Sequence, residues 1–495
     1  MVEPDDMINR DEERAGLQAL LNDGVPRLAL VYGRRRVGKT HLLNRTWPRE
    51  QVFYFTASET TEAQNRDALV EEIGRFLGET LPMGDYRSWR SVFGMLLEMR
   101  APEPLVIVLD EFQYVGEQLT DVRRVASDLN ALWERRRPSR PLVVVLSGSH
   151  VKTMEALVDA GALFGRFNYT TRIRPFDYWD AAQMVPGLSS RDQVRSYAAF
   201  GGTPRYLAAI KPAHPLDTNI ATLLLLPQGE VRGLIESALT QERGLHDVLR
   251  YRAILRAIGT GSTSFSDIRS KAGLQETSET PVRLMLDKLQ QLDYVGATRN
   301  IGAKHTSPYQ YHISDPAFAF YYNFTARHET ALARNAPLHV WNTFMREHFD
   351  SYIGHIFEWI AEQGYARLTG SLSLPAVSEW GRWEGQDRAR QSLEMDIVAP
   401  LVDGRILTGG VKWNAQPLDA KWHYHHMQML ERLRHAGVPW AHEAAQPHAP
   451  IVWVAAGGFT DEFQAAVRRD RAEVYLWSLE DLYREHGEHG PQHSR

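Results

Sequence analysis

Residues 28–40 read LALVYGRRRVGKT, an apolar run followed by two glycines with four residues between them and then by Lys39 and Thr40. This is the G-x-x-x-x-G-K-[ST] spacing of a phosphate-binding loop between a strand and a helix. Glycines let backbone amides curl around phosphate oxygens, and the following helix adds the positive end of its dipole. The lysine supplies charge to the β- and γ-phosphates, and the threonine offers a hydroxyl to Mg²⁺.

The loop predicts a site for ATP and Mg²⁺, with Lys39 acting on phosphate and Thr40 on the metal. A chance glycine loop before a helix is the plain structural alternative. The residues expected to bind the nucleotide are Gly33, Arg34, Arg35, Arg36, Val37, Gly38, Lys39, Thr40 and His41.

A second apolar run, LVIVL at residues 105–109, leads directly into Asp110 and Glu111. A wholly apolar strand is typical of a central parallel strand covered on both faces. Ligands of open α/β sheets sit at the carboxyl ends of such strands. We therefore expect Asp110 to hold Mg²⁺ and Glu111 to polarise the attacking water. A solvated turn would explain the Asp110–Glu111 pair by itself. It is a poor explanation when the phosphate-binding loop pattern occurs in the same chain.

Two later residues are further catalytic candidates, and each has a simpler alternative. Ser149 follows the apolar run 142–146 and could position water or sense phosphate loss, or it could belong to a serine turn. Arg166 could neutralise transition-state charge, or it could be a structural ion-pair partner. Local sequence leaves both choices open.

Residues 175–243 are predicted to be helical, with Gly201, Gly202 and Pro204 near the middle. The glycines can end one helix, and the proline can begin the next at its first turn. The functional interpretation is a lid that places Pro204 near the adenine and Arg205 toward the phosphates. Both interpretations remain open at this point.

Together these motifs resemble the prokaryotic AAA+/STAND-type P-loop proteins often called the archaeal ATPase family. The resemblance rests on NRDEE at 9–13, DEFQ at 110–113, SGS at 147–149, GR at 165–166 and GGTPRY at 201–206. It implies a five-stranded parallel core with a helical lid, and an ATP-hydrolysing enzyme. It also implies the roles given above to Lys39, Thr40, Asp110, Glu111, Ser149, Arg166, Pro204 and Arg205.

Residues 246–313 are predicted to form three helices and a hairpin, the pattern of a winged helix. This span holds nine Lys and Arg against six Asp and Glu, whereas the whole chain has a net charge of −5. If it binds duplex DNA, the third helix would enter the major groove with Arg283 and Lys288 exposed. A winged helix used only for packing or protein contact is the alternative.

The last α/β segment resembles the C-terminal module commonly fused to this ATPase family, which has a restriction-endonuclease (PD-(D/E)xK) fold. The resemblance implies a metal site at Glu358, Asp396 and Lys412. However, the position two before Lys412 is Gly410, which has no oxygen to donate to a metal. Glu394 lies on the same side of the predicted strand as Asp396 and could compensate. We expect a degenerate nuclease site, and an ATP-gated nuclease remains the rival interpretation.

Composition excludes several other classes. The chain has 495 residues and no cysteine, so it has neither disulfides nor thiolate metal sites. The acidic start lacks the pattern of a signal peptide, and no apolar run reaches the ~18 residues that span a bilayer. We therefore expect a cytoplasmic protein with no membrane contact. Candidate partners are duplex DNA and a second copy of the chain.

The predicted fold class is α/β: a P-loop parallel sheet with a helical lid, then a winged helix and a smaller restriction-endonuclease-like α/β domain. A nucleotide switch that hydrolyses slowly and recruits a protein is a second rival function. The predicted domains are a P-loop core at 1–175, a lid at 176–245, a winged helix with an aromatic helix at 246–335, the nuclease-like domain at 336–482 and a disordered tail at 483–495.

Overall fold

The computed structural model describes residues 7–99, 103–135, 140–159, 163–242, 245 and 247–484. Contacts between residues divide the chain into two units. The first consists of residues 1–175 with the short segments 203–205 and 242–244, and the second consists of all other residues. Each unit is described on its own below.

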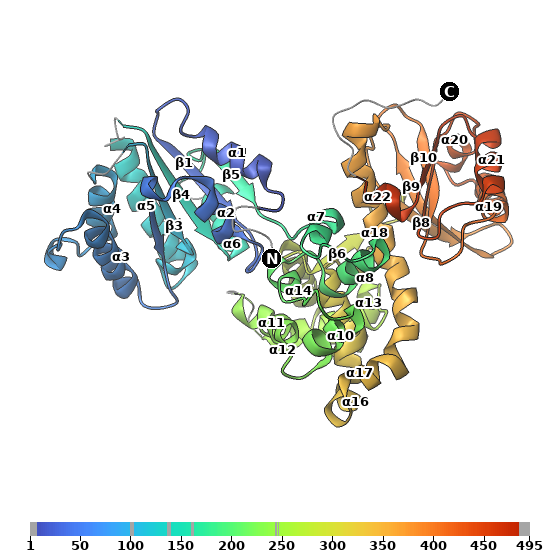
Figure 1. Ribbon diagram of the computed structural model, residues 1–495, viewed down its shortest axis with the longest axis horizontal. Coiled ribbons are helices and arrows are strands. Elements are labelled where there is room, and N and C mark those ends of the chain that lie inside the picture. Colours follow the sequence, from blue (N-terminus) through green and yellow to red (C-terminus); the bar gives the residue numbers. More distant parts are fainter. Residues whose placement is uncertain are drawn as a thin grey trace. The chain divides into compact units, whose positions relative to one another are not determined.

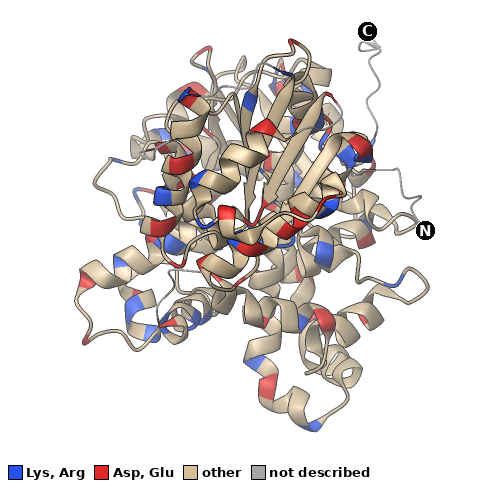
Figure 2. Cartoon of the chain, turned by 90° about the vertical axis from the view of Figure 1, so that its left-hand side faces the viewer, with Lys and Arg blue, Asp and Glu red and all other residues tan. Residues whose placement is uncertain are grey.

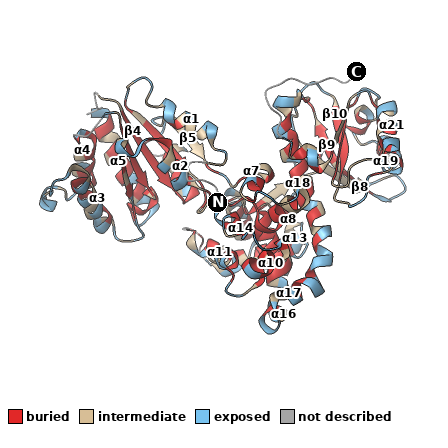
Figure 3. Ribbon diagram, viewed as in Figure 1, coloured by how far each residue is buried: buried red, intermediate tan, exposed pale blue. Residues whose placement is uncertain are grey.

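Five parallel strands form the sheet of the first unit, in the order β2-β3-β4-β1-β5 (Figure 1). Every residue of β3 and β4 is buried, as their uninterrupted apolar runs predict (Figure 3). The strands are β1 (Arg27–Tyr32), β2 (Val52–Thr56), β3 (Leu105–Asp110), β4 (Leu142–Gly148) and β5 (Tyr169–Arg172). The predicted parallel core is thus confirmed.

Helices cover both faces of this sheet. Their bounds are α1 (Asp11–Ala19), α2 (Lys39–Thr46), α3 (Glu62–Leu77), α4 (Trp89–Glu98), α5 (Leu119–Arg135) and α6 (Val151–Asp159), with short turns η1 (Arg49–Gln51), η2 (Met83–Asp85) and η3 (Phe112–Tyr114). One apolar core lies between the sheet and α3, α4, α5 and α6. A second core lies between the sheet and α1 and α2. Because α2 begins directly after β1 and the loop, this packing fixes the phosphate loop between strand and helix.

The second unit begins with helices where a lid was expected. They are α7 (Tyr178–Gln183), α8 (Ser190–Phe200), α9 (Pro204–Leu207), α10 (Leu216–Ile220), η4 (Ala221–Leu225), α11 (Glu230–Ala238) and η5 (Leu239–Gln241). The first residues of α9 group with the first unit instead, as does Glu242. Both points matter for the nucleotide site described below.

Three helices and an antiparallel hairpin follow, in the order expected for a winged helix. They are α12 (Val248–Gly259), α13 (Phe265–Lys271), α14 (Glu279–Gln291), β6 (Val295–Thr298) and β7 (Gln310–Ile313). Helix α12 packs against α13, α14 and β7.

An aromatic helical segment comes next. It consists of α15 (Pro316–Phe320), η6 (Tyr321–Thr325), η7 (Ala326–His328), α16 (Glu329–Arg334), α17 (Pro337–Val340) and η8 (Trp341–Met345), and it leads into the long α18 (Arg346–Leu372). Phe320 and Phe324 pack against Trp341 and Phe349, so these rings form core rather than a stacking platform. The turns η4, η6 and η8 are π-helical.

A mixed five-stranded sheet ends the chain, in the order β12-β11-β10-β9-β8. Its elements are β8 (Gly381–Gln386), β9 (Ser392–Pro400), β10 (Ile406–Lys412), α19 (Ala420–Ala436), α20 (Ala441–Ala444), β11 (Ile451–Ala455), α21 (Asp461–Asp470), β12 (Val474–Trp477) and α22 (Leu479–Leu482). Strands β8, β9 and β10 are antiparallel neighbours, and β10, β11 and β12 run parallel. Tyr483 packs against Tyr178, while residues 485–495 of the predicted tail lie outside the described residues.

Surface charge is mixed in sign. Figure 2 shows Lys and Arg interspersed with Asp and Glu along the helices that face the viewer. This pattern agrees with the small net charge, and any anionic partner would have to bind a local cluster of cations. Within the described ranges, no helix combines the length and apolar character that a bilayer crossing requires.

Candidate nucleotide-binding and nuclease-like sites

The phosphate loop needs glycine at both of its ends. Gly33 has φ 154°, and a Cβ there would stand 2.1 Å from the carbonyl oxygen of Ile173. Gly38 has φ 98°, a left-handed backbone conformation that residues with a Cβ rarely adopt. Helix α2 begins at Lys39, so its N-terminal amides face the loop.

Lys39 lies inside this loop, with only 5% of its surface exposed. Its Nζ donates to the carbonyl oxygens of Gly33 and Arg34, at 2.9 and 3.1 Å. Burial lowers the pKa of the ammonium, and the carboxylates of Glu111 and Asp110 oppose that shift. The side chain is thereby held in place before any phosphate arrives.

The remaining loop residues lie around this lysine. Arg34 is buried, Arg35 donates to the hydroxyl of Tyr114, and Arg36 adopts a left-handed φ of 72°. Val37 packs in the core between the sheet and α1 and α2. On α2, burial lowers the pKa of His41, and the nearby Arg45 adds to that effect.

Asp110, at the end of β3, is the point where the two predicted motifs meet. Its Oδ2 accepts hydrogen bonds from Thr40 Oγ1 at 3.0 Å and from the Tyr54 hydroxyl at 2.7 Å. Its Oδ1 accepts from the backbone N–H of Glu111 at 2.9 Å. A hydroxyl and a carboxylate oxygen side by side next to a phosphate loop are the hard donors that Mg²⁺ prefers. The residues present therefore fit the predicted metal.

Glu111 has a left-handed φ of 52°, and two side chains fix its carboxylate. Ser149 Oγ donates to Glu111 Oε2 at 2.6 Å, and Gln113 Nε2 donates to the same oxygen. Gln113 Nε2 also lies 3.2 Å from Ser149 Oγ. Ser149 and Gln113 have no exposed surface. The structure thus brings Ser149, predicted as a sensor, onto the residue predicted to orient water.

Other predicted residues lie less centrally. Arg166 forms a 3.0 Å ion pair with Glu134 at the surface, with 45% of its side chain exposed. A Cβ built on Gly38 would lie 4.0 Å from Pro204 Cγ, so the start of α9 borders the phosphate loop. Arg205 is exposed. The catalytic role of Arg166 and the adenine role of Pro204 remain predictions.

Sequence patterns missed Glu242, which groups with the first unit although it lies far along the chain. Only 7% of its surface is exposed. Burial raises the pKa of the Glu242 carboxyl to about 7, against the opposing charges of Arg34, Arg35 and Lys39. An acidic group thus lies among the cations that are expected to receive phosphate.

The nuclease-like residues occupy one region of the C-terminal sheet. Lys412 Nζ on β10 pairs with Asp396 Oδ2 on β9 at 2.6 Å. The same oxygen accepts from the backbone N–H of Val411 at 2.9 Å. Two of the three predicted residues are therefore brought together, with the aspartate already neutralised by the lysine.

The third predicted residue, Glu358 on α18, faces an arginine instead. Arg382 on β8 lies 3.8 Å from a Glu358 oxygen and 3.4 Å from a Glu394 oxygen, and it pairs with Glu384. Glu394, which was considered as a compensating ligand, is thus also paired with this guanidinium. The place where a nuclease would gather carboxylates around a metal holds a side-chain cation of this chain.

Gly410 has a steric explanation. A Cβ at this position would stand 2.5 Å from Cζ3 of the Trp453 ring on β11. The ring therefore fills the space that a metal-binding glutamate would need. Across the described residues, no group of three or more His, Cys, Asp or Glu side chains is arranged to hold a metal ion.

Comparisons with known proteins agree with the nucleotide site. Residues 7–210 match the family described as an ATPase domain predominantly from archaea, and residues 321–423 match archaeal and bacterial proteins of unknown function. An uncharacterized protein of Methanocaldococcus jannaschii is 22% identical over 417 residues, covering 82% of this chain and 87% of the relative.

Two solved structures overlap the chain in part. A Walker-type ATPase of Pyrococcus abyssi has TM-score 0.46 and 20% identity, covering 64% of this chain and 96% of its own. The Aeropyrum pernix ORC2 protein, in ADPNP and ADP complexes, has TM-score 0.42 and 13% identity, covering 66% of this chain and 96% of its own. From the family match, residues 7–210 form an ATP-binding ATPase domain.

We expect Glu242→Gln to tighten ATP binding in a pH-dependent way. Above the pKa of about 7, ionised Glu242 opposes the triphosphate beside Lys39, whereas the protonated acid does not. Affinity for a non-hydrolysable analogue, measured by calorimetry, should rise about tenfold, or about 1.4 kcal/mol, near pH 8 and stay unchanged near pH 5.5. Equal effects at both pH values would contradict this, and the exposed Glu276→Gln is the matched control.

The raised pKa of Glu242 also predicts that the free energy of unfolding depends on pH. Between the unfolded pKa of 4.5 and the folded value of about 7, the folded chain retains a proton that the unfolded chain has released. The stabilisation is therefore complete below pH 4.5 and is lost as pH rises through about 7. Denaturant unfolding should show this slope in the unchanged chain and a shallower one in Glu242→Gln.

We expect Gly410→Glu to destabilise the C-terminal sheet without creating a nuclease. The new side chain would collide with Trp453, at a cost of about 2 kcal/mol or more in the free energy of unfolding. Plasmid DNA incubated with the variant and Mn²⁺ should remain uncut. Val402→Glu, at a position with 72% exposure, should change stability by less than about 0.5 kcal/mol. Metal-dependent cleavage by Gly410→Glu would show that only one ligand was missing.

Proposed function

We propose that this chain, whose residues 7–210 match an ATPase domain predominantly from archaea, couples Mg²⁺-dependent ATP hydrolysis to duplex DNA contact by the winged helix predicted at 246–313. The observation that carries the catalytic part is the fixed carboxylate of Glu111. Ser149 and Gln113 hold it beside the Asp110–Thr40 pair, where an attacking water has to be oriented.

The site residues of the first unit take different parts in this mechanism. Lys39 and the amides at the start of α2 bind the β- and γ-phosphates, and Thr40 and Asp110 hold Mg²⁺. Held by Thr40 and Asp110, Mg²⁺ would supply charge that offsets the negative charge on the phosphate oxygens. Glu111 accepts a hydrogen bond from the attacking water and orients it toward the γ-phosphate. Ser149 positions Glu111 and loses that role if its hydroxyl turns toward phosphate.

The DNA part rests on the three helices and hairpin and on their excess of basic residues. On α14, Arg283 is 54% exposed and lies between Glu279, at 2.9 Å, and the ring of Phe265. A fixed exposed guanidinium suits a phosphate or a base edge. Lys288, which is half-buried rather than exposed as expected, follows it on the same helix.

The nuclease-like domain is proposed not to cut DNA. Support comes from the Asp396–Lys412 pair, from Arg382 among three glutamates and from the space that Trp453 takes at Gly410. Each of these four carboxylates thus already lies beside a cation of the chain. The ATP-gated nuclease therefore has less support than an ATPase with a non-cleaving C-terminal domain.

Two substitutions test the ATPase assignment. Glu111→Gln should retain ATP binding and lower turnover at least about 100-fold, because the neutral amide orients and polarises the attacking water less than the carboxylate does. Lys39→Ala should abolish binding, since the phosphates lose their buried cation. Phosphate release and analogue titration measure the two effects. Unchanged turnover in either variant would defeat the assignment, and the exposed Glu71→Gln should behave like the unchanged chain.

Hydrolysis measured with and without duplex DNA tests the coupling. We expect DNA to raise turnover, and Arg283→Ala with Lys288→Ala to remove most of that increase and reduce its salt dependence. Arg334→Ala, on the exposed side of α16, is the matched control. Turnover that is indifferent to DNA would contradict the coupling while leaving the ATPase assignment intact.

A further inference from the structure

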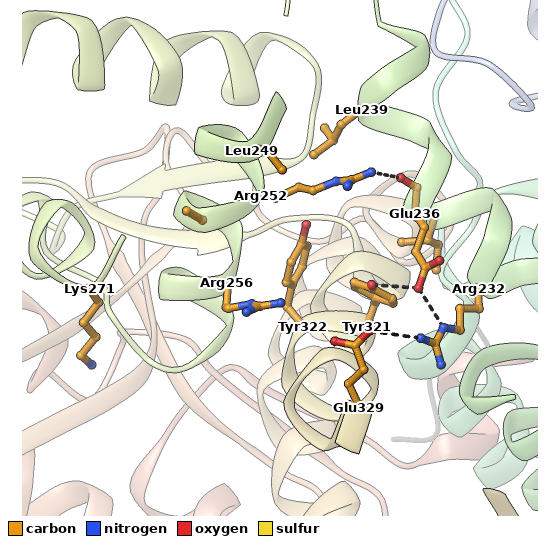
Figure 4. A pocket seen from close by; sticks show the side chains of 12 residues that line it. Arg232, Glu236, Leu239, Leu249, Arg252, Arg256, Lys271, Tyr321, Tyr322 and Glu329 are labelled. Carbon is orange, nitrogen blue, oxygen red and sulfur yellow. Dashed lines mark hydrogen bonds and ion pairs between the residues drawn. The ribbon is translucent and has the colours of Figure 1, made fainter. Parts of the chain in front are cut away.

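A cavity of about 620 Å³ lies within the second unit and is lined in part by the helices of the winged-helix segment. Its walls come from α11, α12, the end of α13 and the π-helical turn η6 (Figure 4). The volume falls within the ~300–1,000 Å³ of small-molecule sites. π-helical turns are rare and are frequent at functional sites. This pocket therefore has the size and construction of a ligand site.

The pocket is rich in cations, and one of them is neutralised. Arg232, with 6% exposure, pairs with Glu236 at 2.8 Å and with Glu329 at 3.9 Å. Arg252 donates to the backbone carbonyl oxygen of Glu236 at 2.6 Å, which leaves its charge uncompensated.

Two further cations line the same space. Arg256 projects from α12 toward the middle of the pocket, and Lys271 lies at the end of α13 (Figure 4). Within the part of the chain that the structure describes, neither Arg256 nor Lys271 forms an ion pair. Four basic side chains thus face two carboxylates, and the pocket carries a net charge of about +2 at neutral pH.

Aromatic and apolar groups complete the walls. The Tyr321 hydroxyl donates to Glu236 Oε1 at 3.0 Å, so this ring is fixed. Tyr322 packs beneath α12, where a Cβ on Gly259 would stand 2.5 Å from its own Cβ. Its hydroxyl points toward the side of the pocket that holds Arg252 (Figure 4). Leu239 and Leu249 add apolar surface.

We propose that this pocket is a second ligand site, which binds a small phosphate-bearing molecule of about mononucleotide size. Arg252, Arg256 and Lys271 bind the phosphate, because guanidinium forks and ammonium groups are the strongest phosphate donors among side chains. Tyr322 donates a further hydrogen bond, and Leu239 and Leu249 cover the uncharged part of the ligand. The ligand therefore needs both a phosphate and a modest apolar body.

Calorimetry on the full chain tests this site, with Lys39→Ala present to disable the phosphate loop. The probes are AMP, pyrophosphate and, as the uncharged control, adenosine. We expect AMP to bind, pyrophosphate to bind more weakly and adenosine to show no binding. Adding Arg256→Glu with Lys271→Glu should weaken AMP binding at least tenfold, whereas Arg334→Glu should change it less than twofold.

Both reversed residues are exposed, so the fold should survive, and the unfolding temperature without ligand checks this. Tyr322→Phe removes a single hydroxyl and should weaken AMP binding about threefold while leaving that temperature unchanged. Absent AMP binding, equal binding of adenosine, or binding indifferent to the charge reversals would each overturn the proposal. A ten-nucleotide single strand that binds this pocket more tightly than AMP would also overturn it, in favour of a nucleic-acid site.

Discussion

The buried carboxylate of Asp110 is the constraint on which the first unit depends. Only 2% of its surface is exposed, and an isolated charge in such a place would be strongly unfavourable. Thr40 from α2, Tyr54 from β2 and the amide of Glu111 each donate to it. These bonds fix the distance between the start of α2 and the end of β3, so one residue sets the geometry of the site at which Mg²⁺ is proposed to bind.

The groups around the Lys39 ammonium compensate its positive charge less than a bound phosphate would. Its ammonium bonds to two carbonyl oxygens, which are weaker partners than a phosphate. Glu242 lies among the same cations, but burial favours its neutral form, so it neutralises them only in part. A triphosphate can therefore gain more from Lys39 and Arg34 than the protein's own carboxylates do.

Sequence predicted those features that are local in the chain. The loop at 33–40 and the pair Asp110–Glu111 follow apolar strands, and both spacing and burial were readable from neighbouring residues. Tyr54 and Glu242 were missed because their partners lie far along the chain, and single buried polar residues have no periodic signal. Glu242 is the extreme case, since it meets a loop some 200 residues earlier.

The C-terminal site also depends on contacts between residues that lie far apart in the chain. The resemblance implied Glu358, Asp396 and Lys412, and the last two do meet. What the resemblance did not contain was Arg382 on β8, whose partners come from α18, β8 and β9. Burial on α19 likewise depends on distant partners: His423 and His426 are buried and bonded to Asp470 and Thr408, while His425 is exposed.

Comparing the two aspartate–lysine sites explains why they differ in chemistry. In the first unit, among the residues that the structure describes, Asp110 accepts only from neutral donors and Lys39 donates only to carbonyl oxygens, so each charge retains its attraction for an incoming ion. In the C-terminal sheet, Lys412 neutralises Asp396, and Arg382 lies among three glutamates. A dication entering there would have to displace two cations that are covalently part of the chain. The same residue types thus differ in what they can attract, because Asp396 has a cationic partner in the chain and Asp110 has neutral ones.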